Sequence, residues 1–391
     1  MLCDNDRTQR SRRLPVSCLH EIHRLVTDHP RDAIALHVGE PHVRMPAEAV
    51  EGYVRALRDG RTSYTDAPGL PVLRAALAER LRDNGAPAPD RVFVTPGSCQ
   101  AISAIFQSIA VDGGEVILSR VHWPMHLQQI LLAGLEPRFA AMPDGGRPLT
   151  ELLDEAASER TVALLINSPA NPSGHVWGPE DLAQMYAWAA RRGVWIISDE
   201  AYEDFVYEGE PCRIANLDLA VPPDERIVFS VHTFSKGFSM TGCRLGYATA
   251  PRADRAELLA RVQEATLVAP ATPVQYAGLA ALRATDHLTA HHGYVRATRD
   301  AAVKLLAPLG VVHTEPSGGW YLLLDLSDHT DDTYAFCHRL LAETDVGVAP
   351  GRGFLPPDDP LAERLVRVTL CAEQEATLTG VQRLVRLLRS P

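Results

Sequence analysis

Between residues 91 and 250 the chain alternates short apolar runs with longer segments whose apolar positions recur every three or four residues. The short runs are flanked by Gly, Pro or polar residues, which is typical of buried strands in a parallel sheet. We expect strands at 91–95, 115–119, 137–141, 161–166, 194–198 and 226–231. Helices are expected between most of them, around 101–110, 124–133, 149–158 and 179–192. This alternation predicts a doubly wound α/β sheet.

The flanking segments have less regular patterns. A polar N-terminal arm with a short amphipathic patch precedes a strand near Ile34, and residues 245–250 could pair antiparallel with the strand before them. Helices are expected over 253–306. Beyond Pro308, strand candidates at 320–326, 346–350 and 365–371 alternate with helices, which predicts an α+β region. We expect a large domain at 49–285, and a smaller domain formed by 286–391 with part of 1–48.

Composition narrows the functional classes. The 391 residues are 46% hydrophobic and 22% charged, which is ordinary for a soluble globular enzyme. The net charge of -11, without a basic block, argues against a nucleic-acid partner. No apolar run approaches the ~18 to 20 residues of a membrane helix, and no secretory signal is expected. Seven cysteines at irregular spacings form neither a zinc pattern nor a disulfide framework, so we expect no metal site and a cytoplasmic location.

Lysine usage points to one residue. Of the 38 Lys and Arg residues, only Lys236 and Lys304 are lysines. Lys304 lies in a helical pattern, where a solvent-facing lysine is expected. Lys236 follows the strand at 226–231 and lies among hydroxyl residues. Because lysine, unlike arginine, can lose its proton and form a Schiff base, Lys236 is a candidate nucleophile.

Unusual residues follow the predicted strands one after another, and ligands of an open α/β sheet bind beyond the carboxyl ends of its strands. A small-residue turn into a helix at 96–100 would offer backbone N–H groups to a phosphate. The other strand ends carry Trp123, the Asn171-Pro172 turn (which could be cis), Asp199 with Tyr202, and Thr233 with Ser235 and Lys236. Each alone is more often a turn, a cap or a core residue. Together, on successive strand ends, they predict a binding site.

These residues also carry a family resemblance. In order, the motifs are Gly39-Glu40-Pro41, Tyr64…Gly69-Leu70, Gly97-Ser98-x-Gln100-Ala101, Asn171-Pro172-x-Gly174, Asp199-x-x-Tyr202, Ser235-Lys236 with Arg244-Leu245-Gly246, Pro350-Gly351-x-x-Phe354 and Val366-Arg367-Val368. With this set the chain resembles the class I/II aminotransferases, which use pyridoxal 5′-phosphate (PLP). The resemblance implies the fold type I of PLP-dependent transferases, with a mostly parallel sheet in the large domain and a smaller α+β domain.

The resemblance and the chemistry of PLP together imply catalytic roles. Lys236 would bind PLP as a Schiff base and then serve as the base that moves the α-proton. Asp199 would face the pyridine nitrogen and keep it protonated. Asn171 and Tyr202 would hydrogen-bond the 3-oxygen of the ring, and Trp123 would stack on the ring.

The same resemblance implies binding roles. The phosphate would be bound by Ser98, Cys99, Thr233, Ser235 and Arg244. Arg367 would bind the substrate α-carboxylate bidentately, beside Gly39 and Asn171. Tyr64 would reach the PLP phosphate of a neighbouring subunit, which implies a homodimer with composite active sites.

Several positions depart from the family pattern, among them His42 and Arg44 after Gly39-Glu40-Pro41. Thr233 stands where serine is usual, and the hydroxyl is retained. Cys99 offers only a weak donor, so backbone N–H groups would carry that part of the phosphate site. Arg352 is bulkier and more charged than the small residue usual there. We expect it either to bind a polar or anionic group of the substrate side chain, or to be a surface arginine paired with Asp358 or Asp359.

Two functions are compatible with these features, and a third is not. The leading one is transfer of an amino group between an amino acid and a 2-oxo acid. The alternative is a PLP enzyme that performs β- or γ-elimination, replacement or cyclisation on an amino acid side chain, since surroundings steer PLP chemistry. A ligand-sensing regulator would need a DNA-binding module before the PLP domain, and the roughly 30 preceding residues are too few for one.

Overall fold

The apolar runs between residues 92 and 249 form one seven-stranded sheet of order β2-β8-β7-β6-β5-β3-β4 in the computed structural model, which describes residues 9–82, 89–142 and 147–389. Its strands are β2 (Val92–Thr95), β3 (Glu115–Ser119), β4 (Glu136–Ala140), β5 (Thr161–Asn167), β6 (Trp195–Asp199), β7 (Val228–Thr233) and β8 (Gly246–Thr249). Only β8 runs antiparallel to its sheet neighbours, β2 and β7. The expected strands and the antiparallel pairing of 245–250 are therefore confirmed, with shifts of one or two residues at the ends.

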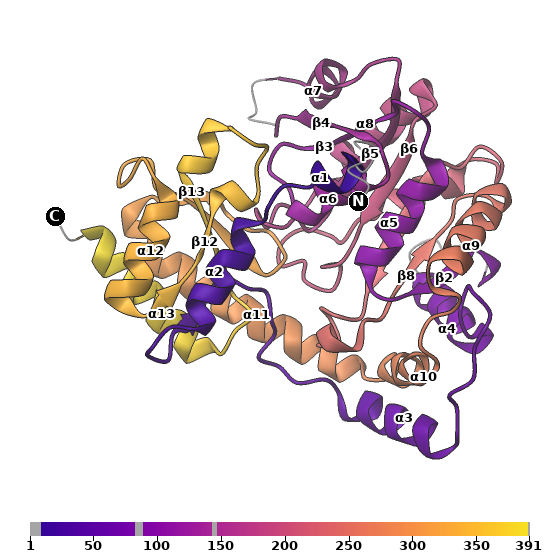
Figure 1. The fold of residues 1–391 in the computed structure, drawn as a ribbon, viewed down its shortest axis with the longest axis horizontal. Coiled ribbons are helices and arrows are strands. Elements are labelled where there is room, and N and C mark those ends of the chain that lie inside the picture. Colours follow the sequence, from indigo (N-terminus) through magenta and orange to yellow (C-terminus); the bar gives the residue numbers. More distant parts are fainter. Residues whose placement is uncertain (1–8, 83–88, 143–146, 390–391) are drawn as a thin grey trace, which may run out of the picture.

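Helices cover both faces of this sheet (Figure 1). They are α4 (Pro71–Arg82), α5 (Ser98–Ile109), α6 (Pro124–Leu132), α7 (Leu149–Ala156), α8 (Pro179–Arg192), α9 (Ala253–Leu267) and α10 (Thr272–Ala281), and α3 (Ala47–Arg58) packs on α10. Successive strand residues point to opposite faces. Leu165 thus joins the core under α5 and α9, while Leu164 joins the core under α7 and α8. This arrangement confirms the doubly wound α/β prediction.

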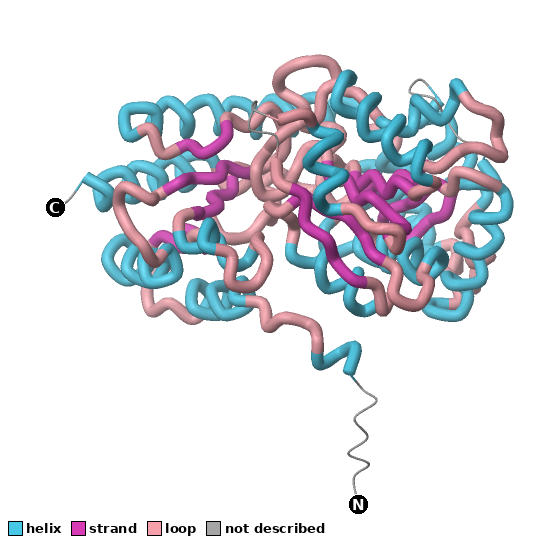
Figure 2. Tube along the Cα trace, turned by 90° about the horizontal axis from the view of Figure 1, so that it is seen from above, coloured by secondary structure: helices cyan, strands magenta, loops and turns pink. Residues whose placement is uncertain are grey.

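A second lobe holds much of the C-terminal third of the chain, drawn in orange to yellow in Figure 1, and Figure 2 shows the two lobes side by side. Its antiparallel sheet has the order β12-β13-β10-β9, with β9 (Val312–Thr314), β10 (Tyr321–Asp325), β12 (Ala349–Pro350) and β13 (Leu365–Thr369). A parallel pair, β1 (Ile34–Ala35) and β11 (Val346–Gly347), lies beside it. The expected single strand over 346–350 is thus two short strands in different sheets, and β9 was not predicted. The proposed domain boundaries remain predictions.

The helices of this lobe include an N-terminal one. They are α2 (Cys18–Thr27), α11 (Thr285–Leu306), α12 (Thr333–Thr344) and α13 (Gln374–Arg389). Ile22 and Val26 of α2 are buried in the same core cluster as β10 and β13. Before α2, the segment with α1 (Gln9–Arg12) crosses to the large sheet, where Arg13 pairs with Glu136 of β4 at 2.6 Å. The N-terminal arm therefore spans both lobes.

Short 3-10 helices complete the described structure, at Pro89–Arg91, Ile214–Ala220, Thr241–Cys243, Ala307–Leu309, Gly351–Gly353 and Pro360–Glu363. Among the described residues, no helix combines the length and the apolar character needed to cross a membrane.

Candidate active site

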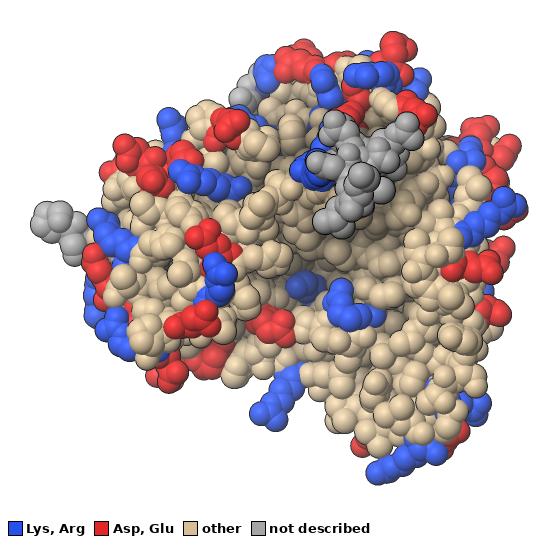
Figure 3. Space-filling view, viewed as in Figure 1, with Lys and Arg blue, Asp and Glu red and all other residues tan. Residues whose placement is uncertain are grey.

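A cavity of about 680 Å³ lies at the carboxyl ends of β5, β6 and β7. Figure 3 shows the corresponding face hollowed between the two lobes, with Lys or Arg atoms inside the hollow. The predicted residues that line it are Gly39, Ser98, Cys99, Trp123, Asn171, Asp199, Tyr202, Thr233, Ser235, Lys236, Arg244 and Arg367. Segments from residue 39 to residue 367 thus meet at one edge of the sheet, as the topology predicts for an open α/β fold.

Lys236 lies just past β7, half-buried at the centre of the cavity wall. Its Nζ donates one hydrogen bond, to the Gly39 carbonyl oxygen at 3.3 Å. The same nitrogen lies 4.7 Å from the ring centre of Trp320 and 5.5 Å from that of Tyr202. Lys304, in contrast, is exposed on α11 as expected. The Lys236 amine therefore makes one hydrogen bond and contacts two rings. Since it forms no ion pair with a described residue, it remains available to a carbonyl ligand in the cavity.

Asp199 ends β6 and is 3% exposed. Its Oδ2 lies 2.8 Å from Nε2 of His126, and its Oδ1 accepts a hydrogen bond from the Ala201 backbone N–H at 3.1 Å. His126 was not predicted. It lies three residues beyond Trp123 at the start of α6, and the two rings meet edge to face at 5.1 Å. The spacing from Trp123 was the signal available in the sequence, since residues three apart share a helix face.

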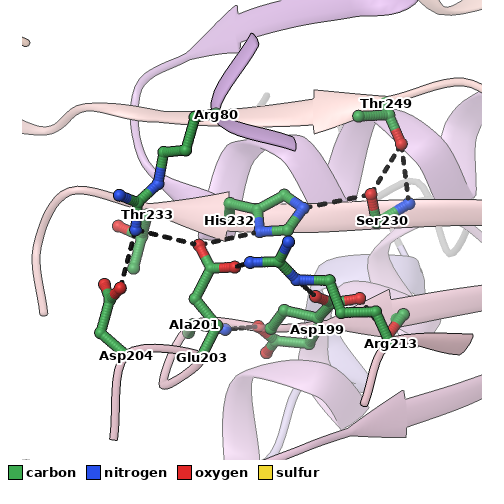
Figure 4. A network of polar contacts seen from close by, with 12 residues as sticks. Arg80, Asp199, Ala201, Glu203, Asp204, Arg213, Ser230, His232, Thr233 and Thr249 are labelled. Atoms are coloured by element: carbon green, nitrogen blue, oxygen red, sulfur yellow. Dashed lines mark hydrogen bonds and ion pairs between the residues drawn. The ribbon is translucent and has the colours of Figure 1, made fainter. Parts of the chain in front are cut away.

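Behind Asp199 lies a buried ionic network (Figure 4). Glu203 pairs with Arg213 and, at 3.1 Å, with Nδ1 of His232, while Arg80 pairs with Asp204 at 2.7 Å. Burial alone would raise the pKa of Glu203, but Arg213 and His232 lower it below its usual range. This network contains three possible metal ligands: a carboxylate oxygen of Glu200, one of Glu203 and a ring nitrogen of His232 all lie within 4.8 Å of one another. Arg213 pairs with both carboxylates, so these groups already share a cationic partner within the protein.

The N-terminus of α5 forms one end of the cavity. Gly97 has φ +83°, and a Cβ there would lie 2.6 Å from the guanidinium of Arg244. Hydroxyls of Ser98, Thr233 and Ser235 line the same cavity as Arg244. A helix N-terminus with hydroxyls and a guanidinium suits a phosphate dianion.

Cys99 contributes little as a donor to this end. Its Sγ contacts Nε2 of Gln129 at 3.2 Å, and burial raises the pKa of the thiol. The thiol therefore stays neutral, and a phosphate here would rely on the backbone N–H groups at the start of α5.

Arg367 lies on β13, at the opposite wall, and is 5% exposed. Its guanidinium carbon is 4.1 Å from the ring centre of Tyr321 and 4.5 Å from that of Phe354. One terminal nitrogen donates to Oδ1 of Asn171 at 3.0 Å and the other to the His37 carbonyl oxygen at 2.6 Å. Nε is buried without a partner among the described residues. A buried planar cation that packs on two rings and keeps an unpaired N–H suits a carboxylate.

Tyr202 and Tyr321 join the two lobes at the cavity, with their hydroxyl oxygens 3.0 Å apart. Burial, and then the neighbouring Tyr321, raise the pKa of Tyr202 well above its usual value. The phenol of Tyr202 is therefore protonated near neutral pH and can donate a hydrogen bond into the cavity.

Two predicted residues lie outside this cavity. Tyr64 is 86% exposed and does not line it. Arg352 forms two hydrogen bonds to Glu363, at 2.6 and 2.8 Å, and its nearest other carboxylate is that of Asp332 at 3.7 Å. The expectation that Arg352 contacts the substrate side chain is therefore not supported. The guanidinium is used in a surface pair, with Glu363 rather than Asp358 or Asp359 as its partner.

Comparison with known proteins gives a consistent result. The family model "Aminotransferase class I and II" matches residues 31–384. The chain is 34% identical to an aspartate/prephenate aminotransferase of Thermus thermophilus, over 91% of both chains. A structure of the aspartate aminotransferase of that organism superposes with a TM-score of 0.88 at 31% identity, covering 97% of this chain and 98% of that one. An aromatic aminotransferase from Pyrococcus horikoshii superposes with 0.84 at 28% identity, covering 95% and 98%.

Proposed function

The chain belongs to the aminotransferase class I and II family, and from this premise we propose that the cavity binds PLP on Lys236 and an amino acid substrate on Arg367. The activity of the enzyme is the transfer of an amino group between an amino acid and a 2-oxo acid. The relatives are named as transferases, which favours this reaction over elimination or cyclisation. The observation that carries the proposal is the meeting of Lys236, Asp199, Arg244 and Arg367 in one cavity.

The residues present fit the cofactor. The α5 N-terminus with Arg244 suits the phosphate, and the buried carboxylate of Asp199 suits a protonated ring nitrogen. When bound, PLP supplies an electron sink for the pair left as the substrate loses its α-proton. His126 holds the Asp199 carboxylate in one orientation, so that this carboxylate can stabilise positive charge on the ring. Trp123 lines the same wall and can cover one face of a planar ligand.

Protein groups position the substrate and carry its proton. Arg367 binds the α-carboxylate through its fork, while Asn171 and Tyr321 keep the guanidinium in place. Lys236 lines the same cavity, and its Nζ would hold the cofactor; once a substrate amine had taken its place there, the freed amine would be able to accept the α-proton of the substrate. The Tyr202 phenol, whose pKa is raised, would be able to donate a hydrogen bond to the 3-oxygen of the cofactor ring.

The test of this assignment is the identity of the labelled lysine. Borohydride reduction of the holoenzyme should leave the mass of the cofactor on the peptide that contains Lys236. Lys236→Ala should lose ~10²- to 10⁴-fold or more in rate, as expected for loss of a catalytic base. Lys304→Ala is the matched control, since Lys304 is the other lysine of the chain and is exposed. Label on Lys304 would overturn the proposal.

We further propose that the enzyme is a two-fold homodimer in which Tyr64 reaches the partner's cofactor. Tyr64 is 86% exposed, and Val50, Val54 and Leu57 form an exposed apolar stripe on α3. Mixing Tyr64→Phe subunits with Lys236→Ala subunits tests this. If Tyr64 acts across the interface, a mixed dimer has one intact site and activity returns. If exchange is proven and activity does not return, Tyr64 serves its own chain.

A cytoplasmic location is also proposed. The cysteines for which the structure gives a state are all free thiols. Free thiols are typical of proteins in a reducing compartment.

A further inference from the structure

Lys236 begins a tight turn directly after β7. Its backbone carbonyl accepts a hydrogen bond from the Ser239 N–H at 3.1 Å, and Ser239 has φ +53°, a left-handed conformation that costs energy in a residue other than glycine. Gly237 is buried in the turn, where an added Cβ would overlap the carboxylate of Asp204 and lie 2.9 Å from Leu288 of α11. The turn therefore has little free space, and its conformation depends on the groups packed around it.

One of these groups is His291 of α11. Its Nδ1 lies 3.2 Å from the Gly237 carbonyl oxygen and 3.5 Å from the hydroxyl of Ser239. A carbonyl oxygen only accepts hydrogen bonds, so Nδ1 carries the ring proton. The side chain is completely buried, burial lowers its pKa to about 4, and Nε2 has no partner among the described residues. The ring is therefore neutral near pH 7, and it donates through Nδ1.

The same imidazole also packs against the indole that contacts the Lys236 amine. The ring centres of His291 and Trp320 are 5.5 Å apart, and both rings contact Phe205, at 5.0 and 5.2 Å. The Nζ of Lys236 lies 4.7 Å from the ring centre of Trp320. His291 thus contacts the turn at the backbone end of the lysine and the indole at its amine end.

Packing of α11 fixes the position of this imidazole. Leu288 packs against a core cluster of the first lobe, whereas Val295, one turn after His291, is buried in the core of the C-terminal lobe. His287, one turn before His291, is half-buried near the same turn; burial lowers its pKa and the Gly237 carbonyl raises it. Of the two histidines, His291 is the fully buried one, so its position relative to the turn is the more tightly fixed.

We propose that His291 is a positioning residue for the catalytic Lys236. By donating to the Gly237 carbonyl and packing on Trp320, it fixes the direction in which the lysine amine points into the cavity. Loss of this donor would remove a partner of a buried carbonyl, and the turn would shift to satisfy it. The proposal rests on the proposed function, because it takes Lys236 as the residue that binds the cofactor.

The experiment compares two substitutions in holoenzyme. His291→Leu removes the donor and keeps a buried apolar side chain, whereas His291→Asn places an amide nitrogen near the position of Nδ1. Two quantities are measured: the pH at which the absorbance of the lysine-bound cofactor changes, and kcat and KM separately.

We expect His291→Leu to lower the pH midpoint of the absorbance change by about half a unit, because the face of Trp320 favours the cationic form of the nitrogen. It should also lower kcat roughly 10-fold, the scale of one buried hydrogen bond left unmade. KM should stay within about 2-fold, since the contacts of Arg367 are unchanged. His291→Asn should restore both the midpoint and kcat.

His292→Leu is the matched control. Nε2 of His292, the next residue of α11, lies 2.9 Å from the carbonyl oxygen of Val206, outside the lysine turn. This substitution removes the same kind of contact from the same helix, so the absorbance midpoint and kcat should stay as in wild type. Equal changes in His291→Leu and His292→Leu overturn the inference, because the effect would then come from the helix as a whole.

The other outcomes separate this inference from the proposed function. An unchanged midpoint and kcat in His291→Leu, or a His291→Asn enzyme that behaves like His291→Leu, overturns the inference and leaves Lys236 as the cofactor residue. If His291→Leu does not fold or does not bind the cofactor, His291→Gln, whose amide lies nearer Nε2, must shift the midpoint while His291→Asn does not, or the inference fails. If borohydride reduction does not label Lys236, the proposed function fails and this inference fails with it.

Discussion

Arg367→Lys is the substitution that most directly tests how the cavity holds its substrate. The change keeps the positive charge but removes the planar fork. In the structure the guanidinium carbon lies 4.1 Å from the ring centre of Tyr321 and 4.5 Å from that of Phe354. The guanidinium also donates to Asn171 and to the backbone of His37. An ammonium group can replace the charge but not this geometry.

The size of the effect follows from the hydrogen bonds at stake. A lysine at this position can make one of the two parallel bonds that a guanidinium makes to a carboxylate. One hydrogen bond to a charged group contributes ~1.5 to 3 kcal/mol. We therefore expect kcat/KM for an amino acid to fall roughly 10- to 150-fold, since every 1.4 kcal/mol is a factor of ten.

The assay compares an amino acid with the amine that lacks only its α-carboxylate. Wild-type enzyme should strongly prefer the amino acid, and Arg367→Lys should lose that preference while its slow reaction with the amine stays the same. Arg364→Lys, at an exposed arginine just before β13, is the control and should behave as wild type. An equal loss with both substrates would refute the reasoning, because the defect would then be structural. An unchanged preference would refute it as well, because the carboxylate would bind elsewhere.

Two further predictions concern stability. Glu203→Gln should lower the free energy of unfolding by ~1.5 to 3 kcal/mol, because it removes the charged partner of a buried hydrogen bond to Arg213, while Arg213 keeps its contact with Glu200. Glu79→Gln, in an exposed pair, should change it by less than ~1 kcal/mol, and equal changes in denaturant titrations would contradict this. Burial lowers the pKa values of His37, His122 and His291 to about 4. Between pH ~6.5 and ~4 these histidines bind protons in the unfolded chain but not in the folded one, so the free energy of unfolding decreases as the pH is lowered, by up to ~3 kcal/mol per histidine. An unfolding midpoint that does not change over this pH range would contradict the prediction.

Much of the fold was predictable because its signal is local. Each buried strand of the large sheet is a short apolar run between turn residues, and each turn at a strand end places its residues at the same edge of the sheet. We could therefore predict from the sequence that three residues, Lys236, Asp199 and Thr233, lie close together at this edge. The weaker signals failed where the segments were short: 346–350 divides into β11 and β12, and β9 is three residues long.

The sequence by itself determined which segments are strands, and therefore which residues meet at the carboxyl edge of the sheet, because apolar periodicity and turn residues act within a few positions. Only the tertiary structure decided the partners of individual side chains, because those partners come from distant segments. Asp199 takes His126 from 73 positions away, and Arg367 takes the backbone of His37 from 330 positions away. Arg352 pairs with Glu363 instead of facing the cavity, and α2 brings His20 and His23 to it. Such pairings depend on how two lobes pack, which no local pattern records.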